Sequence, residues 1–322
     1  MPVYRPRPVP SGVIRVLGNS HMDQLAEIWE EGFRALQPGV RFENTYLGTA
    51  NAIAGLYLKT ADVALMGREV MRMEDIAYRR VFTNSPLQVA VATASFNVPL
   101  ETFAFAIFVN RRNPISQLTL QQADAIFGVD RKRGAPAAIA AWGELGLTDE
   151  WAKRPIHLHG YEIGSGLDYF FEQRVLGGSH KWNPGFREYA NAYGEGRKLL
   201  ANAGDLIVKA IAADEAAIGF CGFGHATDQV KALALSEDGR RYVPLTRENV
   251  LNRGYPLTRT VYIDVNSTPV DPRVREFLRF VLSAEGQRCV ERQSVYLPLP
   301  GGFTRAELAK LETATATERQ GQ

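Results

Sequence analysis

Short apolar stretches of strand type alternate with amphipathic helical stretches along most of the chain. Residues 13–17, 40–46 and 61–67 are typical of strands, because their apolar residues either run together or alternate with polar ones. A helix is predicted after the first strand, with one apolar face formed by Leu25, Ile28, Trp29 and Phe33. Strands that alternate with helices favour an α/β fold with parallel strands.

The same alternation continues to the end of the sequence. Further strands are predicted over residues 103–110, 155–159, 217–222 and 260–265. Asn183-Pro184-Gly185 is predicted to break the chain before another helix. The polar tail from Glu307 is predicted to be helical and weakly packed.

Three strand-to-helix junctions share one chemistry. The segments GNSHM (18–22), GTAN (48–51) and GSG (164–166) each combine glycine with a hydroxyl residue. A helix start has unpaired N–H groups and a partial positive charge, and glycine lets a ligand approach them closely. Because ligands of parallel sheets bind at the carboxyl ends of strands, these junctions and Arg68 predict a site for a small anion. For the third junction alone, a tight turn with a serine N-cap is the simpler interpretation.

Composition is that of a globular protein, and it excludes several functional classes. The chain has 322 residues, enough for two domains or one large one, with 45% hydrophobic and 22% charged residues. A net charge of +2 does not indicate nucleic acid, and no apolar run has the length of a membrane span. Cys221 and Cys289 form at most one disulfide, and two inert thiols are the simpler prediction. Prolines replace the apolar core of a signal peptide in residues 1–12, which we interpret as a leader.

Other motifs admit structural explanations. His157 and His159 share a strand face, but no third ligand is placed with them, so packing or surface positions are favoured over zinc. Asp168 near Ser165 suggests acid/base chemistry, yet capping of the helix start explains it. Arg68 has a structural alternative of its own, an ion pair with Glu69, Glu74 or another carboxylate.

Two further motifs are interpreted in the same way. Arg131-Lys132-Arg133 lies in a predicted exposed loop and is interpreted as solvated surface, with a partner or polyanion as the alternative. The glycines of residues 219–224 lack the spacing of a nucleotide loop, so they are assigned to a strand and a turn.

Eight motifs in order resemble the phosphate-type periplasmic solute-binding proteins, the binding components of ABC importers. The matching segments are GNSHM (18–22), GTANA (48–52), ADVA (61–64) leading to Arg68, VN to LT (109–119), WGELG (142–146), GSG (164–166), YPLTR (255–259) and SAEGQ (283–287). The resemblance implies a two-lobed, type II periplasmic-binding-protein-like α/β fold with mixed sheets, a ligand cleft between the lobes, and closure by a hinge. We expect a leader at 1–12, one lobe from 13–102 with 260–322, and a second from 103–259.

The resemblance also implies a ligand set. The implied ligand-binding residues are Asn19, Ser20, His21, Thr49, Arg68, Tyr161, Ser165, Gly166 and Leu167. Hydroxyls and the N–H groups of Gly166 and Leu167 would donate hydrogen bonds, while Arg68 would supply positive charge.

Three positions depart from the pattern of the family. His21 stands where a small hydroxyl residue is usual, Tyr161 where an arginine is common, and Leu167 where a threonine is usual. The histidine provides a charge that depends on pH. The resemblance makes phosphate the expected ligand. The three departures make another oxyanion, or an organic anion whose ring stacks on Tyr161, the alternative.

These inferences predict an extracytoplasmic receptor, periplasmic or on the cell surface, that delivers a small anion to the membrane subunits of an ABC transporter. We expect a monomer without catalytic residues, metal, cofactor or nucleic-acid partner. One alternative is an anion sensor or scaffold that feeds no transporter. Another is a hydrolase, a phosphatase or esterase, that uses Ser165 and needs a base within hydrogen-bond reach.

Overall fold

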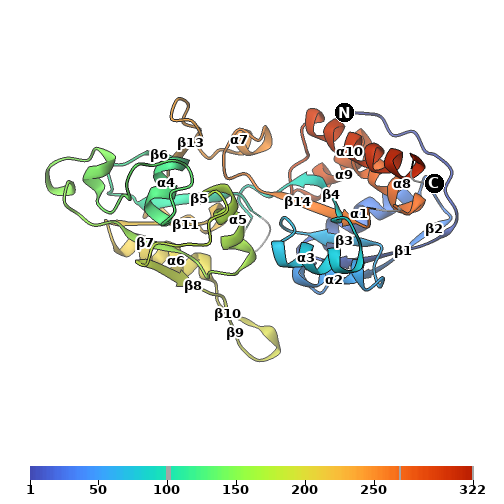
Figure 1. Ribbon diagram of the computed structural model, residues 1–322, viewed down its shortest axis with the longest axis horizontal. Helices are drawn as coiled ribbons and strands as arrows, with labels where there is room; N and C mark the ends of the chain where they lie inside the picture. The colour runs from blue at the N-terminus through green and yellow to red at the C-terminus, as the bar shows by residue number, and fades with distance from the viewer. Residues whose placement is uncertain (99–102, 268–269, 321–322) are drawn as a thin grey trace. The chain divides into compact units, whose positions relative to one another are not determined.

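The computed structural model describes residues 1–98, 103–267 and 270–320. The chain divides into two compact units (Figure 1): the first unit is Met1–Ser95 with Arg259–Gln322, and the second unit is Phe96–Thr258. The chain passes between the units twice, after Ser95 and after Thr258. The boundary expected at 102 and 103 falls partly on residues 99–102, which lie outside the described residues.

The first unit is built on a five-stranded sheet in the order β2-β1-β3-β14-β4. Its strands are β1 (Gly12–Gly18), β2 (Val40–Thr45), β3 (Val63–Met66), β4 (Leu87–Thr93) and β14 (Thr260–Val265). β1 pairs in parallel with β2 and β3, and β14 is antiparallel to β3 and β4. Every residue of β3 is buried, as expected for a strand covered on both faces.

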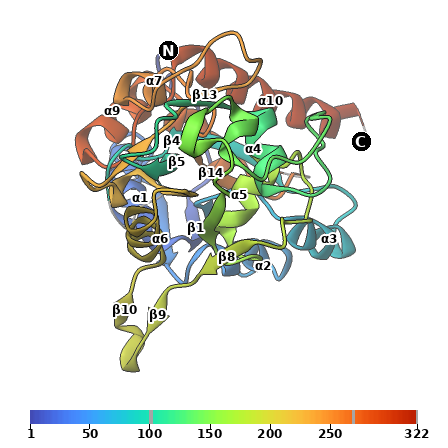
Figure 2. The ribbon, with the colours of Figure 1, turned by 90° about the vertical axis from the view of Figure 1, so that its left-hand side faces the viewer.

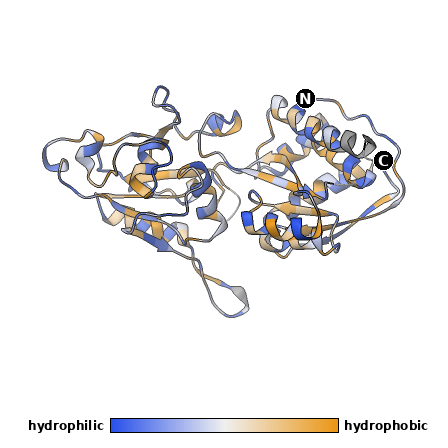
Figure 3. Cartoon of the chain, in the orientation of Figure 1, coloured by the Kyte–Doolittle hydropathy of each residue, from blue (hydrophilic) through white to orange (hydrophobic). Residues whose placement is uncertain are grey.

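Helices cover both faces of this sheet. Their bounds are α1 (Asp23–Arg34), α2 (Thr49–Tyr57), α3 (Arg72–Val81), α8 (Pro272–Val281), α9 (Ala284–Gln293) and α10 (Gly301–Gln320). The larger core cluster joins α1, α8, α9 and α10 to the sheet, and a smaller cluster joins α2 and α3 to the other face. In Figure 3 these helices change between hydrophobic and hydrophilic residues along their length, as amphipathic helices do.

Segments near both ends of the described chain pack within the first unit. Tyr4 is buried, its N–H donates to Glu285 Oε2 at 2.7 Å, and its ring meets Phe280 edge-on at 5.3 Å. The predicted weak packing of the tail is wrong for its first half: Leu311 is fully buried, and Glu307 accepts a hydrogen bond from the N–H of Ala90 in β4.

The second unit contains a five-stranded sheet in the order β12-β5-β11-β7-β8. Its strands are β5 (Phe105–Asn110), β7 (His157–Tyr161), β8 (Phe186–Tyr189), β11 (Ala217–Gly222) and β12 (Val230–Ala232). β7 is parallel to β8 and β11, whereas β5 is antiparallel to β11 and β12. Two-stranded sheets are formed by β6 (Gln117–Thr119) with β13 (Ala234–Ser236), and by β9 (Ala192–Tyr193) with β10 (Leu199–Ala201).

Helices again lie on both faces of this sheet. The unit contains α4 (Leu120–Phe127), α5 (Gly166–Arg174), α6 (Ala203–Ala213) and α7 (Arg247–Leu251). Phe171 of α5 stacks on Phe220 of β11 with ring centroids 3.7 Å apart, and Phe127 of α4 meets the same ring edge-on. A Cβ atom on the neighbouring Gly219 would instead lie 2.9 Å from Ile211 of α6, because successive strand residues point to opposite faces.

The helix expected after Asn183-Pro184-Gly185 is wrong. The chain forms β8 and then the β9–β10 hairpin, which projects from the second unit in Figures 1 and 2. Phe186 of β8 stacks on Trp182 at 4.5 Å, while Gly196 adopts a left-handed conformation in the loop with φ of 65°. In this segment β8 packs an aromatic ring against the core, whereas both residues of β9 are exposed. The segment therefore lacks the repeating apolar face that a buried helix needs.

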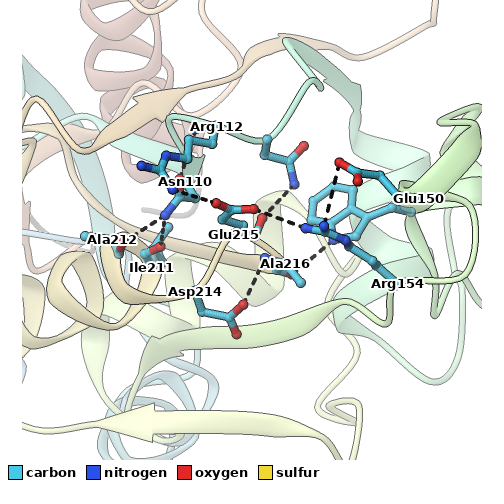
Figure 4. A network of polar contacts seen from close by, with 11 residues as sticks. Asn110, Arg112, Glu150, Arg154, Ile211, Ala212, Asp214, Glu215 and Ala216 are labelled. Carbon is cyan, nitrogen blue, oxygen red and sulfur yellow. Dashed lines mark hydrogen bonds and ion pairs between the residues drawn. The ribbon is translucent and has the colours of Figure 1, made fainter.

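A polar network fixes the loop between α6 and β11 (Figure 4). The Glu215 carboxylate accepts hydrogen bonds from Arg112 at 3.0 Å and from Arg154 at 3.1 Å. Asn110 Nδ2 donates to the carbonyls of Ile211 and Ala212, which satisfies two acceptors at the carboxyl end of α6.

Both cysteines are buried free thiols, Cys221 in the second unit and Cys289 in the first. Burial raises the pKa of the Cys221 thiol, which keeps it protonated and unreactive. Among the described residues, no helix combines the length and the apolar character needed to cross a membrane.

Candidate functional site

Backbone hydrogen bonds draw together the loops that follow β1, β2 and β3. The N–H of Gly48 donates to the Gly18 carbonyl at 2.9 Å, and the N–H of Asn19 donates to the Leu65 carbonyl at 3.0 Å. A Cβ atom on Gly18 would lie 2.3 Å from the Leu65 oxygen, so only glycine permits this approach. Two of the predicted anion-binding junctions therefore meet at one edge of the first sheet.

Asn19 organises the first of these loops. Its side-chain oxygen accepts from the N–H of His21 at 3.0 Å and caps a 3₁₀ turn, Ser20–Met22. α1 begins directly after this turn, and its N-cap residue, Met22, makes no side-chain capping hydrogen bond. Ser20 and His21 are exposed, while the His21 carbonyl accepts from the Tyr296 hydroxyl at 2.7 Å.

Thr49 joins the second loop to the segment after β3. Its hydroxyl accepts a hydrogen bond from the N–H of Gly67 at 3.3 Å, and the Gly67 carbonyl accepts from Arg259 Nη2 at 3.0 Å. Arg259 is buried at the start of β14. The sequence contains Arg259 within a family motif, but only the sheet order shows that it reaches this edge.

Arg68 makes the ion pair that the structural alternative anticipated. Its guanidinium binds the Glu74 carboxylate through two hydrogen bonds of 2.7 Å and donates to the Glu69 carbonyl. Glu74 also accepts from the N–H of Met71 at the start of α3. The Glu74 carboxylate thus compensates the positive charge of Arg68, and the electrostatic attraction between Arg68 and an anion is weaker as a result.

The second unit contributes the start of α5. Gly164 has φ of +90°, a conformation that strains other residues, and this turn leads into Ser165 as the N-cap of the helix. The Ser165 hydroxyl accepts from the N–H of Asp168, and the Asp168 carboxylate accepts from the N–H of Gly164 at 3.0 Å. In the described part of the chain, the N–H groups of Gly166 and Leu167 have no hydrogen-bond acceptor. Two backbone donors therefore remain for a ligand.

Negative charge lies beneath these donors. Asp168 is 1% exposed, and its burial raises its pKa to about 6, with the nearby Glu172 carboxylate adding to the shift. Glu172 is itself buried and accepts from Trp182 Nε1 at 2.8 Å. The partial positive charge of the helix start stabilises the Asp168 carboxylate, so a bound anion would share that charge with it.

The side chains beside Ser165 do not form a hydrolytic triad. Its hydroxyl donates a hydrogen bond to the Asp168 carboxylate at 3.2 Å. Within the described residues, the four histidines of the second unit pair with other groups; the pairs are His157 with Asp214, His159 with Tyr189, His180 with Glu172 and His225 with Asp205. No histidine of this unit is therefore hydrogen-bonded to Ser165 as a general base.

A pocket of about 240 Å³ opens beside the start of α5, and we call it the tyrosine pocket. It is lined by Tyr161, Glu162, Ser165, Leu167, Tyr189, Ala190, Asn191, Tyr193 and Ala203. Tyr161 and Tyr189 are register partners at the carboxyl ends of β7 and β8. The structure therefore brings together three predicted residues, Tyr161, Ser165 and Leu167, and adds the hairpin residues that sequence reasoning missed.

No metal site accompanies these residues. The described ranges, 1–98, 103–267 and 270–320, contain no group of three or more histidine, cysteine or acidic side chains placed to hold an ion. The His157 ring contacts Asp214 at 2.5 Å, and the His159 ring contacts the Tyr189 hydroxyl at 3.0 Å. Burial lowers the pKa of His159 to about 4, so this ring is neutral at pH 7.

Two proteins resemble nearly the whole chain in sequence. The phosphate-binding protein PstS of Pseudomonas aeruginosa is 32% identical over 316 residues, which cover 97% of this chain and 90% of that protein. The protein SphX of Synechococcus elongatus is 24% identical over 312 residues, covering 95% of this chain and 83% of the relative.

Two crystal structures confirm the expected α/β fold with two helix-flanked sheets. An ABC-type phosphate transport receptor from Vibrio cholerae superposes with a TM-score of 0.56 at 21% identity, covering 89% of this chain and 100% of its own. PstS from Borrelia burgdorferi gives 0.57 at 15% identity, covering 90% of this chain and 100% of its own. The model of the PBP superfamily domain matches residues 6–285. With this match and a 32% identical relative along nearly its whole length, the chain belongs to the PBP superfamily and, within it, to the family of the phosphate-binding protein PstS.

Proposed function

We propose that this protein is an extracytoplasmic receptor that binds phosphate, or a closely related oxyanion, and delivers it to the membrane subunits of an ABC importer. The observation that carries the proposal is the 32% identity to a phosphate-binding protein over 97% of the chain. The free N–H groups of Gly166 and Leu167 at the start of α5 support it, because such donors suit an oxyanion.

Each unit offers hydrogen-bond donors that suit an anion. The second unit offers the two N–H groups of Gly166 and Leu167. The Ser165 hydroxyl, which donates to the Asp168 carboxylate in the structure, would turn its proton from that carboxylate to the ligand. The first unit offers the hydroxyls of Ser20 and Thr49 on loops that are hydrogen-bonded to each other and to β3. Most of these donors are neutral, so hydrogen bonds rather than net charge would account for most of the affinity.

Charge is supplied conditionally in this proposal. Arg68 is paired with the Glu74 carboxylate. It attracts the ligand through the part of its charge that Glu74 does not compensate, or binds the ligand directly after leaving Glu74. His21 is exposed in the loop after β1 and is a further candidate ligand residue in this proposal. Selection between phosphate and other oxyanions of the same charge would then depend on hydrogen-bond geometry.

Isothermal titration calorimetry with phosphate, sulfate and molybdate at pH 7.5 tests the proposal. We expect phosphate to bind, and Ser165→Ala to weaken it about tenfold through loss of a hydrogen bond to a charged ligand. Thr246→Ala is the matched control, because Thr246 caps α7 in the same unit as Ser165 caps α5. The control variant should bind phosphate like the wild type.

A second pair of variants, one test and one control, examines the first unit. Arg68→Ala should weaken phosphate binding, whereas Arg15→Ala removes a similar bidentate pair with Asp62 and should leave binding unchanged. Silence across the whole panel would overturn the proposal. Unchanged affinity in both Ser165→Ala and Arg68→Ala would show that the anion binds elsewhere.

A further inference from the structure

The tyrosine pocket lies directly beside the proposed anion donors of the second unit. Ser165 and Leu167 belong to the start of α5 and also line the pocket. The opposite wall comes from the end of β8, the β9 strand and the first residue of α6. An anion held at the start of α5 therefore has free volume next to it that phosphate alone does not need.

The hydroxyls of the three tyrosines that line the pocket all have hydrogen-bond partners. The Tyr161 hydroxyl accepts from the N–H of Gly222 at 3.3 Å. The Tyr189 hydroxyl contacts the His159 ring, and the Tyr193 hydroxyl accepts from Asn191 Nδ2 at 3.2 Å. Tyr161 is almost fully buried, so the partly exposed Tyr189 and the exposed Tyr193 offer most of the ring surface to an apolar or aromatic group.

The remaining lining residues reinforce this preference. Leu167, Ala190 and Ala203 are apolar. Both ends of the Asn191 amide form hydrogen bonds: its oxygen accepts from the N–H of Ala203 at 2.8 Å, and its Nδ2 donates to the Tyr193 hydroxyl. Among the described residues that line the pocket, Glu162 carries the only formal charge. A negatively charged group is therefore disfavoured inside it.

Size sets the scale of the occupant. An apolar cavity of about 150 Å³ is enough to bind benzene in another protein. The tyrosine pocket, at about 240 Å³, has room for a six-membered ring with a short linker.

We propose that the tyrosine pocket holds the uncharged cyclic substituent of a phosphate monoester or phosphonate whose anionic head binds at the start of α5. This inference rests on the proposed function, since it uses the same anion donors. It specifies the ligand class as organic phosphates with an apolar ring. The ring packs among the tyrosines, while the phosphoryl oxygens accept from Ser165 and from the N–H groups of Gly166 and Leu167.

Calorimetric titration of the full chain with inorganic phosphate, phenyl phosphate and phenylphosphonate tests the proposal. Phenyl phosphate should bind at least as tightly as phosphate, because burial of the ring adds free energy that inorganic phosphate lacks. If phosphate binds and both phenyl compounds bind about 100-fold more weakly, the pocket proposal is overturned and the proposed function stands. If none of the three binds, the proposed function itself fails.

Two variants place the ring in the pocket. Tyr193→Ala removes an exposed ring of the hairpin and should weaken phenyl phosphate about tenfold through lost aromatic packing. Ala190→Phe, at an exposed lining position, fills the pocket and should weaken phenyl phosphate by a similar or larger factor. Both variants should bind inorganic phosphate within about twofold of the wild type, because neither residue is an anion donor.

Ala137→Phe is the matched control, since it makes the same substitution at an exposed loop position of the same unit outside the pocket. It should bind both ligands like the wild type. Wild-type affinity for phenyl phosphate in both Tyr193→Ala and Ala190→Phe would place the ring elsewhere and overturn the proposal. If Ala190→Phe loses both ligands, thermal unfolding separates misfolding from blockage, and Tyr193→Ala then decides the outcome.

Discussion

Asp264 shows how one residue at the centre of the first sheet sets a dependence of stability on pH. It lies in β14 with no exposed surface, and Gln88 Nε2 donates to its two carboxylate oxygens at 3.2 and 3.1 Å. Burial raises its pKa to about 8, and the nearby Glu74 carboxylate adds to the shift. The folded state therefore binds a proton at neutral pH that the unfolded chain has released.

Asp264→Asn should remove this dependence. Since the folded pKa lies above the unfolded one, wild-type stability falls as pH rises from about 4 to about 8, whereas the variant has no such proton to release. Thermal and urea unfolding between pH 5 and 9 should show the variant more stable at pH 8 by at least about 1 kcal/mol. Asp75→Asn, which alters a surface pair with Arg79, is the control and should not change the slope. A parallel pH profile for Asp264→Asn and the wild type would contradict this account.

Single residues were predictable from sequence where their role is local. Ser165 caps its helix three residues before Asp168, a relation that the sequence itself displays. The pairing of Arg68 with Glu74 was an open alternative, because sequence alone does not decide whether an arginine meets a ligand or a carboxylate. Arg259 was missed as part of the site, since its contact with Gly67 spans 192 positions of the chain.

At the scale of elements, α5 is held at both ends by side chains. Ser165 caps its amino end, and the half-buried Arg133 donates to the carbonyls of Arg174 and Val175 at its carboxyl end. The interpretation of Arg131-Lys132-Arg133 as solvated surface is therefore wrong for Arg133. Burial lowers the pKa of its guanidinium, which nonetheless remains charged at neutral pH.

Arg133→Met should destabilise the protein. Loss of two hydrogen bonds and of a cation at a helix carboxyl end should cost about 1–3 kcal/mol in the free energy of unfolding, measured by urea titration. Lys132→Met is the neighbouring control, because Lys132 is exposed and makes one long contact of 3.4 Å with the Gly178 carbonyl. Equal stability of the two variants would argue against a capping role for Arg133.

The elements that sequence predicted well are those with strong local patterns. The strands at 13–17, 217–222 and 260–265 and the helix that begins at Asp23 were recognised from continuous or periodic apolar residues. β8 and the hairpin were missed because the segment is short, largely exposed and without a repeating face. That hairpin supplies a wall of the tyrosine pocket, so the pocket was not predictable from the motifs alone.

For the whole molecule, the second unit is one continuous stretch of chain, whereas the first unit needs two. The N–H of Phe105 donates to the Leu257 carbonyl at 3.3 Å, so two segments near the ends of the second unit lie together. A continuous stretch with its own sheet and core has the features of an independently folding domain.

A fragment of residues 96–258 should therefore fold alone. It contains Trp142, Trp151 and Trp182, three of the four tryptophans of the chain, so fluorescence reports its unfolding in urea. We expect one cooperative transition. A fragment of residues 1–95, which lacks β14, is the comparison and should show none. A non-cooperative response of the fragment 96–258 would mean that the second unit depends on the first.

Because of the position of β14, the sheet of the first unit can be completed only after the second unit has been synthesised. This strand lies between β3 and β4, yet it is synthesised after residues 96–258. At translation rates of 5–20 residues per second, synthesis of the chain between β4 and β14 takes roughly 10–30 s. β3 and β4 lack the strand between them for that time. During that interval their unpaired edges are open to other chains, and β14 closes them once it has been made.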